Sequence, residues 1–218
     1  GAVLCPLVDF LARYRGTALL LLLLIGLFKV SDLSMAAMAN PLYIDLGFSL
    51  SQIAFITKVF GVIVSILGVL TGGLLAVRFG MLPMLLVAGI AVSATNLLFS
   101  WLVGVGDNLL ALTLVIGADN FASGLSGTVF IAFLSSLTNR VYTATQYALF
   151  SSLMTLPGKF IGGFSGVIVD AQGYAYFFVY SALIGVPAIL LVLYLMYRAD
   201  VGQTVAKNSR SEISGGLT

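Results

Sequence analysis

The chain has 218 residues, of which 60% are hydrophobic and only 8% are charged, and its formal net charge is +2. An ordinary soluble domain carries about 25% charged residues, so this composition excludes a water-soluble globular fold and indicates that lipid covers the surface. The small net charge argues against nucleic-acid binding. The lack of histidine and the single cysteine, Cys5, exclude histidine metal sites, histidine proton relays and an internal disulfide bond.

The predicted elements are membrane-spanning helices, each of which needs about 20 apolar residues. Six stretches reach this length: residues 17–39, 51–77, 81–104, 108–136, 144–169 and 174–197. Residues 1–16 are predicted to form a cytoplasmic, amphipathic lead-in, and residues 199–218 a polar, disordered tail. The expected fold is therefore an all-α membrane protein whose six-helix transmembrane domain covers residues 17–198.

The orientation follows from the basic residues, which prefer the cytoplasmic side of a membrane. With six spans, the Lys and Arg residues outside the spans all fall on one side: Arg13, Arg15, Arg78, Arg140, Arg198, Lys207 and Arg210. The three loops on the other side contain no Lys or Arg. Both termini are therefore predicted to be cytoplasmic. Because the chain begins at Gly1 rather than at a methionine, we expect it to be a piece of something longer.

The chain also contains an internal repeat. Ser49 and Gln52 open the second span, Thr143 and Gln146 open the fifth, and each pair matches a capping box. Glycine-containing segments close both spans, and the two copies lie 94 and 93 residues apart. Each copy holds three spans, and because three is odd, the copies enter the membrane from opposite sides. Two inverted three-helix repeats are typical of secondary transporters.

Five charged residues fall inside the predicted spans: Lys29, Asp32, Lys58, Asp119 and Lys159. An ionisable side chain in mid-membrane costs about 2.5–3.5 kcal/mol, so it normally faces a partner or a wet cavity. The five lie on spans one, two, four and five, which we expect to face a shared pathway. Spans three and six carry no charge and are expected to support the others from the lipid side. The five charges sum to +1, which an anionic substrate or an acidic residue on a missing partner half would balance.

Each of these residues has a structural and a functional interpretation. Lys29 and Asp32 lie one helical turn apart and could form a structural ion pair, or Asp32 could titrate while Lys29 binds substrate. Asp119, beside Asn120, has no basic residue three or four positions away, which favours a role as a proton carrier. Lys58 could extend to the membrane interface or line the pathway.

A proline and a glycine series accompany the last of these charges. Lys159 follows Pro157 and Gly158, and Gly162 and Gly166 continue the glycine series every four residues. Close helix packing through small residues is the favoured interpretation of the glycines. Proline can also bend the helix, and a bend beside Lys159 could matter for a transport cycle.

Several segments carry a resemblance to known families. Residues 73–80, with Gly73, Arg78 and Gly80, are similar to the loop signature of the major facilitator superfamily, although Val77 stands at the acidic position. A closer resemblance is to the AmpG-type muropeptide permeases, and it covers residues 6–198. The segments that carry it are residues 32–41, 43–49, 119–121 and 132–159.

The resemblance implies the C-terminal six-helix half of a major facilitator superfamily transporter in a bacterial inner membrane. It implies proton-coupled import of anhydro-muropeptides for cell-wall recycling, with an N-terminal six-helix half as partner and without a cofactor or metal. An acetyl-CoA-type or other anionic solute transporter is an alternative, and so is a non-transporting fragment or assembly subunit. An intramembrane enzyme is disfavoured because no paired nucleophile and base are evident.

Overall fold

The computed structural model describes residues 4–139 and 142–198, and every secondary-structure element in these residues is a helix. In chain order the elements are α1 (Leu4–Tyr14), the 3₁₀ turn η1 (Arg15–Thr17), α2 (Ala18–Phe28), α3 (Val30–Asp45), α4 (Leu50–Ala54), the π-helical segment η2 (Phe55–Phe60), α5 (Gly61–Phe79), α6 (Met81–Val105), α7 (Leu109–Leu137), α8 (Thr143–Gly162) and α9 (Ser165–Tyr197). Arg140 and the predicted tail at residues 199–218 lie outside the described residues.

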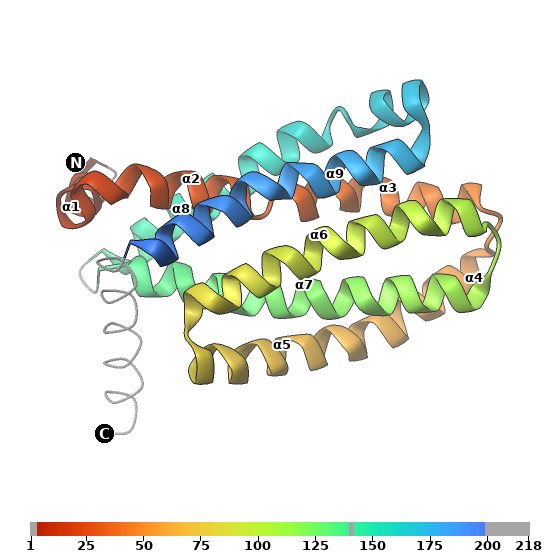
Figure 1. The fold of residues 1–218 in the computed structure, drawn as a ribbon, viewed down its shortest axis with the longest axis horizontal. Coiled ribbons are helices and arrows are strands. Elements are labelled where there is room, and N and C mark those ends of the chain that lie inside the picture. Colours follow the sequence, from red (N-terminus) through yellow and green to blue (C-terminus); the bar gives the residue numbers. More distant parts are fainter. Residues whose placement is uncertain (1–3, 140–141, 199–218) are drawn as a thin grey trace.

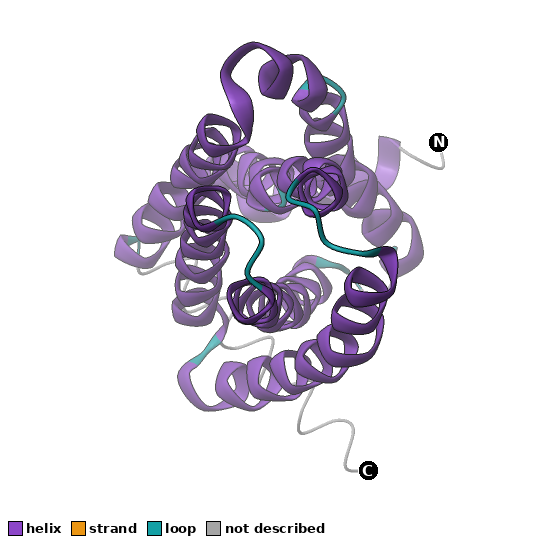
Figure 2. Ribbon diagram, turned by 90° about the vertical axis from the view of Figure 1, so that its right-hand side faces the viewer, coloured by secondary structure: helices purple, strands orange, loops and turns teal. Residues whose placement is uncertain are grey.

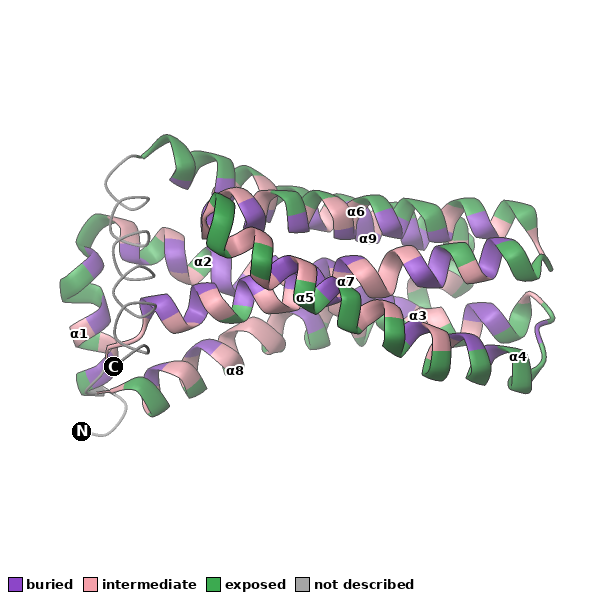
Figure 3. Ribbon diagram, turned by 90° about the horizontal axis from the view of Figure 1, so that it is seen from below, coloured by how far each residue is buried: buried purple, intermediate pink, exposed green. Residues whose placement is uncertain are grey.

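The helices form an elongated bundle in which the chain runs back and forth along one axis (Figure 1). Helices α2 and α3 follow one another away from the end that holds α1, which we call the α1 end. Helix α8 leads away from the α1 end again and α9 returns, so the described chain starts and stops at the same end. Helix α1 itself lies across the bundle axis (Figure 3). Figure 2 views the bundle from the opposite end, where short loops join the helices.

Among the described residues, five helical segments are long and apolar enough to cross a membrane: Cys5–Asp45, Leu50–Phe79, Met81–Val105, Leu109–Leu137 and Ser165–Tyr197. The first three contain the first three predicted spans, and the fourth covers all of the fourth except Asn108. Helix α8 is not among the five, because Ser, Thr and Gln residues interrupt its apolar sequence. The coarse prediction of a multi-spanning all-α protein is confirmed, and a sixth span stays a prediction.

The structure interrupts the fifth predicted span and keeps the predicted turn before the sixth. Residues 144–169 were expected to form one helix, but α8 ends at Gly162 and α9 begins at Ser165. Within the range of α9, two helices meet at Gly173, whose φ of 81° and ψ of 167° are not helical; there the chain turns back toward the α1 end, as the predicted loop before residue 174 requires (Figure 1). A φ of this sign lies in the left-handed region that favours glycine, which is why a glycine stands at the turn.

Two apolar clusters fill the bundle and leave a polar band between them. The cluster at the α1 end includes stacked rings of Phe28 and Phe130, whose centroids lie 4.6 Å apart. The cluster at the opposite end includes Phe99 and Phe178, with centroids 5.2 Å apart. On α3, α6 and α9 the buried polar residues Ser31, Asn96 and Ser181 lie between the residues of these two clusters, so the band marks the middle of the bundle.

Glycines bring the helices of the bundle close together. Helix α5 packs mainly on α7, α6 on α9, and α8 on α2 and α3. At the α5–α7 crossing a Cβ atom on Gly68 would lie 2.3 Å from the carbonyl oxygen of Phe121, and one on Gly124 would lie 2.3 Å from that of Ser65. Neither position has room for a side chain, because real Cβ atoms do not approach backbone oxygens so closely.

Candidate functional site

The candidate site begins at an interruption of the first spanning segment. Helix α2 ends at Phe28, α3 begins at Val30, and Lys29 lies between them with φ of −95° and ψ of 0°. The Lys29 Nζ atom lies 2.7 Å from Asp32 Oδ2, and the two side chains are only 13% and 17% exposed. Interrupted helices are common at transporter binding sites, because the free helix ends interact with ions. Asp32 lies in the first turn of α3, where the helix dipole favours negative charge.

Helix α7 adds a second carboxylate and a hydroxyl group to this pair. Ser123 Oγ donates a hydrogen bond to Asp32 Oδ1 over 3.1 Å. Asp119, one turn earlier on α7, interacts electrostatically with both Asp32 and Lys29. We call Lys29, Asp32, Asp119 and Ser123 the mid-bundle cluster. It combines two carboxylates with one ammonium group, so full ionisation would leave one negative charge uncompensated inside the bundle.

The charge-free α6 supplies the hydrogen-bond partner of Asp119. Thr95 Oγ1 lies 3.2 Å from Asp119 Oδ1 and 2.9 Å from the carbonyl oxygen of Val92. A threonine hydroxyl has one hydrogen, so it can donate to one of these acceptors at a time. Helix α6 therefore does more than the lipid-side support predicted for a span without charge.

The remaining predicted site residues lie elsewhere. Lys58 lies in the π-helical η2 and Lys159 in α8, and both are exposed. Asn120 donates to the carbonyl oxygen of Ile116 on its own helix over 2.9 Å and faces Gly61 of α5. The structure thus brings together three of the five predicted intramembrane charges and places the other two lysines outside the mid-bundle cluster.

The proline and glycine series of α8 lies against α3. A Cβ atom on Gly158 would lie 2.8 Å from side-chain atoms of Leu33, and one on Gly162 would lie 3.6 Å from the Leu33 carbonyl oxygen. Gly166 has open space around it among the described residues. Pro157 lies inside α8, which ends little more than one turn later at Gly162.

Sequence reasoning missed a buried polar chain beside the site. Asn96 Nδ2 donates to Ser31 Oγ over 2.8 Å, and Ser31 Oγ donates to the carbonyl oxygen of Ser181 over 2.7 Å. These residues connect α6, α3 and α9. A Ser or Thr inside a span is a weak signal, because such residues commonly bond to their own helix, as Thr57 does to the carbonyl oxygen of Ile53.

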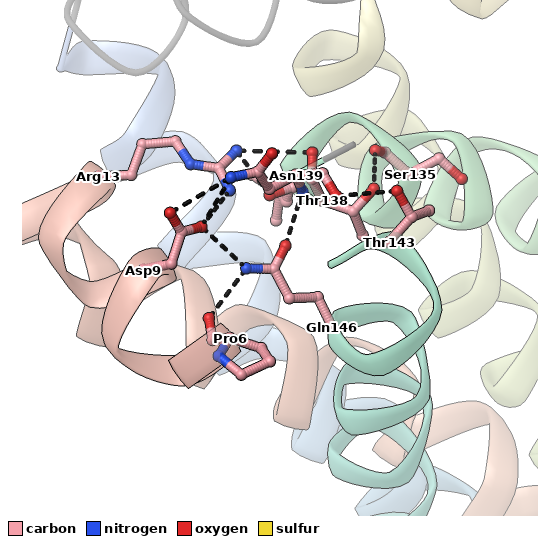
Figure 4. Close-up of polar contacts among 9 residues, drawn as sticks. Pro6, Asp9, Arg13, Ser135, Thr138, Asn139, Thr143 and Gln146 are labelled. Atoms are coloured by element: carbon pink, nitrogen blue, oxygen red, sulfur yellow. Dashed lines mark hydrogen bonds and ion pairs between the residues drawn. The ribbon is translucent and has the colours of Figure 1, made fainter. Parts of the chain in front are cut away.

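A second polar cluster lies at the α1 end and was also missed (Figure 4). Asp9 Oδ2 accepts from Arg13 over 3.0 Å, from Asn139 over 3.1 Å and from Gln146 over 3.2 Å. Gln146 also donates to the carbonyl oxygen of Pro6 over 2.9 Å. These contacts tie α1 to the loop after α7 and to the start of α8. The hydrogen bonds from Asn139 and Arg13 lower the pKa of Asp9 below its ordinary value.

Gln146 corrects one of the two predicted capping boxes. At α4 the box is confirmed, since the Ser49 side chain accepts from the Gln52 backbone N–H and Gln52 accepts from that of Ser49. At α8, within the described residues, Tyr142 is the N-cap and makes no side-chain capping bond. The Gln146 side chain accepts instead from the Asn139 backbone N–H over 2.6 Å and reaches α1. Tertiary partners have displaced the local cap.

Comparisons with known proteins give the family context of these sites. No family model matches the chain. The chain is 34% identical over 200 residues to the protein named "Putative transporter AmpG 4" of Rickettsia felis, covering 92% of the chain and 48% of that protein. It is 33% identical over 194 residues to the anhydromuropeptide permease of Escherichia coli K12, covering 88% of the chain and 39% of that permease.

The chain therefore spans about half the length of the curated relatives it matches. These relatives are named transporters or permeases, which agrees with the prediction that the chain is not an enzyme. Together with the helical bundle and its five candidate spans, the comparisons show that the chain is a multi-pass membrane protein homologous, over most of its length, to about half of an AmpG-type permease.

Proposed function

We propose that this chain is one half of a proton-coupled transporter that imports anhydro-muropeptides across a bacterial inner membrane for cell-wall recycling. The observation that carries the proposal is the mid-bundle cluster, in which Lys29, Asp32 and Asp119 meet among apolar helices. Ionisable groups at such depth mark ion or proton pathways. The substrate class follows the name of the Escherichia coli relative.

In this proposal Asp119 carries the transported proton and Asp32 remains paired with Lys29. When Asp119 is ionised, the Thr95 hydroxyl donates to it. When Asp119 binds a proton, its own O–H donates to Thr95 Oγ1, and the Thr95 hydroxyl turns to the carbonyl oxygen of Val92, which lies 2.9 Å away. Each protonation state then keeps the hydrogen bond between Thr95 Oγ1 and Asp119 Oδ1, so this oxygen has a partner in both forms.

The exposed lysines support a partner that covers them. Lys58 and Lys159 lie inside predicted spans and are exposed on this chain, and an ammonium group facing lipid at that depth is unfavourable. We propose that an N-terminal six-helix half packs on the faces of η2, α5 and α8 and that these lysines face the shared pathway, where they contact substrate carboxylates. The length of the relatives, about twice that of the chain, leaves room for such a half.

Helix packing supports the two inverted repeats. In an inverted repeat, spans one to three correspond to spans four to six. The packing of span two against span four is then equivalent to the packing of span five against span one. The structure contains both contacts, α5 on α7 and α8 on α2 and α3, and α6 packs on α9 as its own equivalent. We further propose that the α1 end is cytoplasmic, because Arg13, Arg15 and Arg78 lie there.

The test is uptake of labelled anhydro-muropeptide into vesicles that contain this chain together with a matching N-terminal half. We expect uptake that depends on a proton gradient and on the presence of both halves. Absence of uptake when both halves are present, or uptake that does not depend on the proton gradient, would contradict the proposal. Stronger competition by acetyl-CoA or another anionic solute than by unlabelled muropeptide would favour that solute as the substrate.

A further inference from the structure

Two consecutive residues of α6 bond to the two helices that carry the mid-bundle acids. Thr95 donates to Asp119 on α7, and Asn96 donates to Ser31 on α3, the residue next to Asp32. Both hydrogen bonds start from the same turn of α6, so this one helix connects α7 to α3. The distance between Asp32 and Asp119 is therefore set by contacts with a single helix, α6.

The link to α3 is fully buried. The side chains of Asn96, Ser31 and Ser181 are 0%, 2% and 0% exposed. The Ser31 hydroxyl accepts from Asn96 and donates to the Ser181 carbonyl oxygen, so both of its hydrogen-bonding roles are used. This matters because α3 starts afresh after Lys29, and its N-cap makes no side-chain capping bond in the described structure.

Packing alone does not explain an asparagine at position 96. Its Oδ1 atom has no hydrogen-bond partner among the described residues, and neither have the hydroxyl groups of Ser93 and Ser181 nearby. An unpaired buried acceptor is unfavourable, whereas a leucine of similar size has no polar group to bury. We therefore look for the role of the Asn96 amide in its hydrogen bond from Nδ2 to Ser31.

We propose that Thr95 and Asn96 are positioning residues that set the spacing and the hydrogen bonding of Asp32 and Asp119, an inference that rests on the proposed function. Asn96 holds the first turn of α3, with Lys29 and Asp32, at the depth of Asp119. The Thr95 hydroxyl donates a hydrogen bond to Asp119 when that residue is ionised and accepts one when it is protonated. Within the described part of the chain, the charged and titratable groups that interact electrostatically with Asp119 are Lys29, Asp32 and Tyr43.

The experiment measures uptake of labelled anhydro-muropeptide against pH in vesicles carrying the full transporter. Thr95→Val removes a stronger, charge-assisted hydrogen bond from the ionised form of Asp119 and a weaker, neutral one from the protonated form, so we expect the pH midpoint of uptake to move upward by about one unit. Asn96→Leu removes the anchor of α3, so we expect uptake to fall about tenfold at unchanged expression. Ser31→Ala combined with Asn96→Leu should lose less than the two single losses multiplied, because both remove the Asn96–Ser31 bond and only Ser31→Ala removes the bond to the Ser181 carbonyl oxygen.

Ser100→Ala is the matched control. Ser100 also lies on α6 and donates to α9, at the carbonyl oxygen of Ala175 over 3.0 Å, but it is more than one turn away from the site. We expect this variant to keep the wild-type midpoint. An unchanged midpoint in Thr95→Val, or an Asn96→Leu variant that matches Ser100→Ala, would overturn the positioning role.

Amide hydrogen exchange separates this inference from the proposed function. If the wild-type transporter takes up no muropeptide, the proposed function fails. Exchange at the first turn of α3 still reports on the anchor, and we expect it to be faster in Asn96→Leu than in Ser100→Ala. Equal exchange in the two variants would refute the anchor, whatever the substrate.

Discussion

The mid-bundle cluster and the cluster at the α1 end both pair a basic residue with an aspartate one turn away. Lys29 and Asp32 lie 2.7 Å apart, and Arg13 and Asp9 lie 3.0 Å apart. The Asp9 carboxylate, 31% exposed, is surrounded by donors from Arg13, Asn139 and Gln146. In the mid-bundle cluster the second acid, Asp119, shares one threonine hydroxyl with a backbone carbonyl.

This difference separates a permanent charge from an exchangeable one. Several donors around Asp9 favour only its ionised form and hold α1 in place. A hydroxyl partner such as Thr95 serves either form of Asp119, because it can donate or accept. The energies differ too, since exposed ion pairs contribute about 0–1 kcal/mol and a stranded charge in mid-membrane costs about 2.5–3.5 kcal/mol. Changes in the mid-bundle cluster should therefore have the larger effects.

The largest effect is expected for Asp119→Asn, which removes the proposed proton carrier while keeping a similar shape. Loss of a group that transfers protons typically costs at least about 100-fold, so gradient-driven uptake should fall by that factor. Asp107→Asn, in the exposed loop before α7, is the control and should stay within about twofold. Retention of gradient-driven uptake by a folded Asp119→Asn transporter would assign the proton to another group.

Lys29→Met tests the ion pair and should mainly affect stability. It leaves the Asp32 carboxyl group without its basic partner, so the free energy of unfolding should fall by about 2.5–3.5 kcal/mol. The double variant Lys29→Met/Asp32→Asn removes both charges and should recover most of that loss without recovering uptake. Thermal unfolding in detergent measures the first effect. Equal stability of the single and double variants would mean that water already solvates Asp32.

At the α1 end, Asp9→Asn should cost only about 1 kcal/mol, because the pair is partly exposed and screened by solvent. Uptake should change little, and hydrogen exchange in α1 should become faster than in the wild type. A loss of uptake comparable with that of Asp119→Asn would show that this end takes part in transport and would remove the contrast between the two clusters.

The smallest predicted effect is a pH dependence at the same aspartate. The pKa of Asp9 is lowered from the ordinary value of 3.8, so its stabilising contribution is present above pH 3.8 and is lost as the pH falls through the lowered value. The difference in melting temperature between wild type and Asp9→Asn should therefore shrink below pH 3.8. A difference that persists unchanged into stronger acid would mean that the carboxylate charge is not what holds α1.

The chain order of the spans could be predicted because apolar length is a local property. The expected spans 81–104 and 108–136 agree closely with α6 and α7. Helical spacing offered the Lys29–Asp32 ion pair as one of two interpretations, and the structure contains that pair. The capping pattern at Thr143 and Gln146 is equally local, yet it did not form, because Asp9 and Pro6 offered Gln146 partners that no window of the sequence contains.

The sequence by itself determined that this protein lies in a membrane, since so few charges cannot cover a surface in water, and which acids and lysines are candidates for transport. Only the tertiary structure decided which of them meet. Convergence of Lys29, Asp32 and Asp119, the contribution of Thr95 and Asn96 from a charge-free helix, and the exposure of Lys58 all depend on how helices rotate and cross. Those angles result from close packing at positions such as Gly68 and Gly158, where the neighbour on another helix sets the fit.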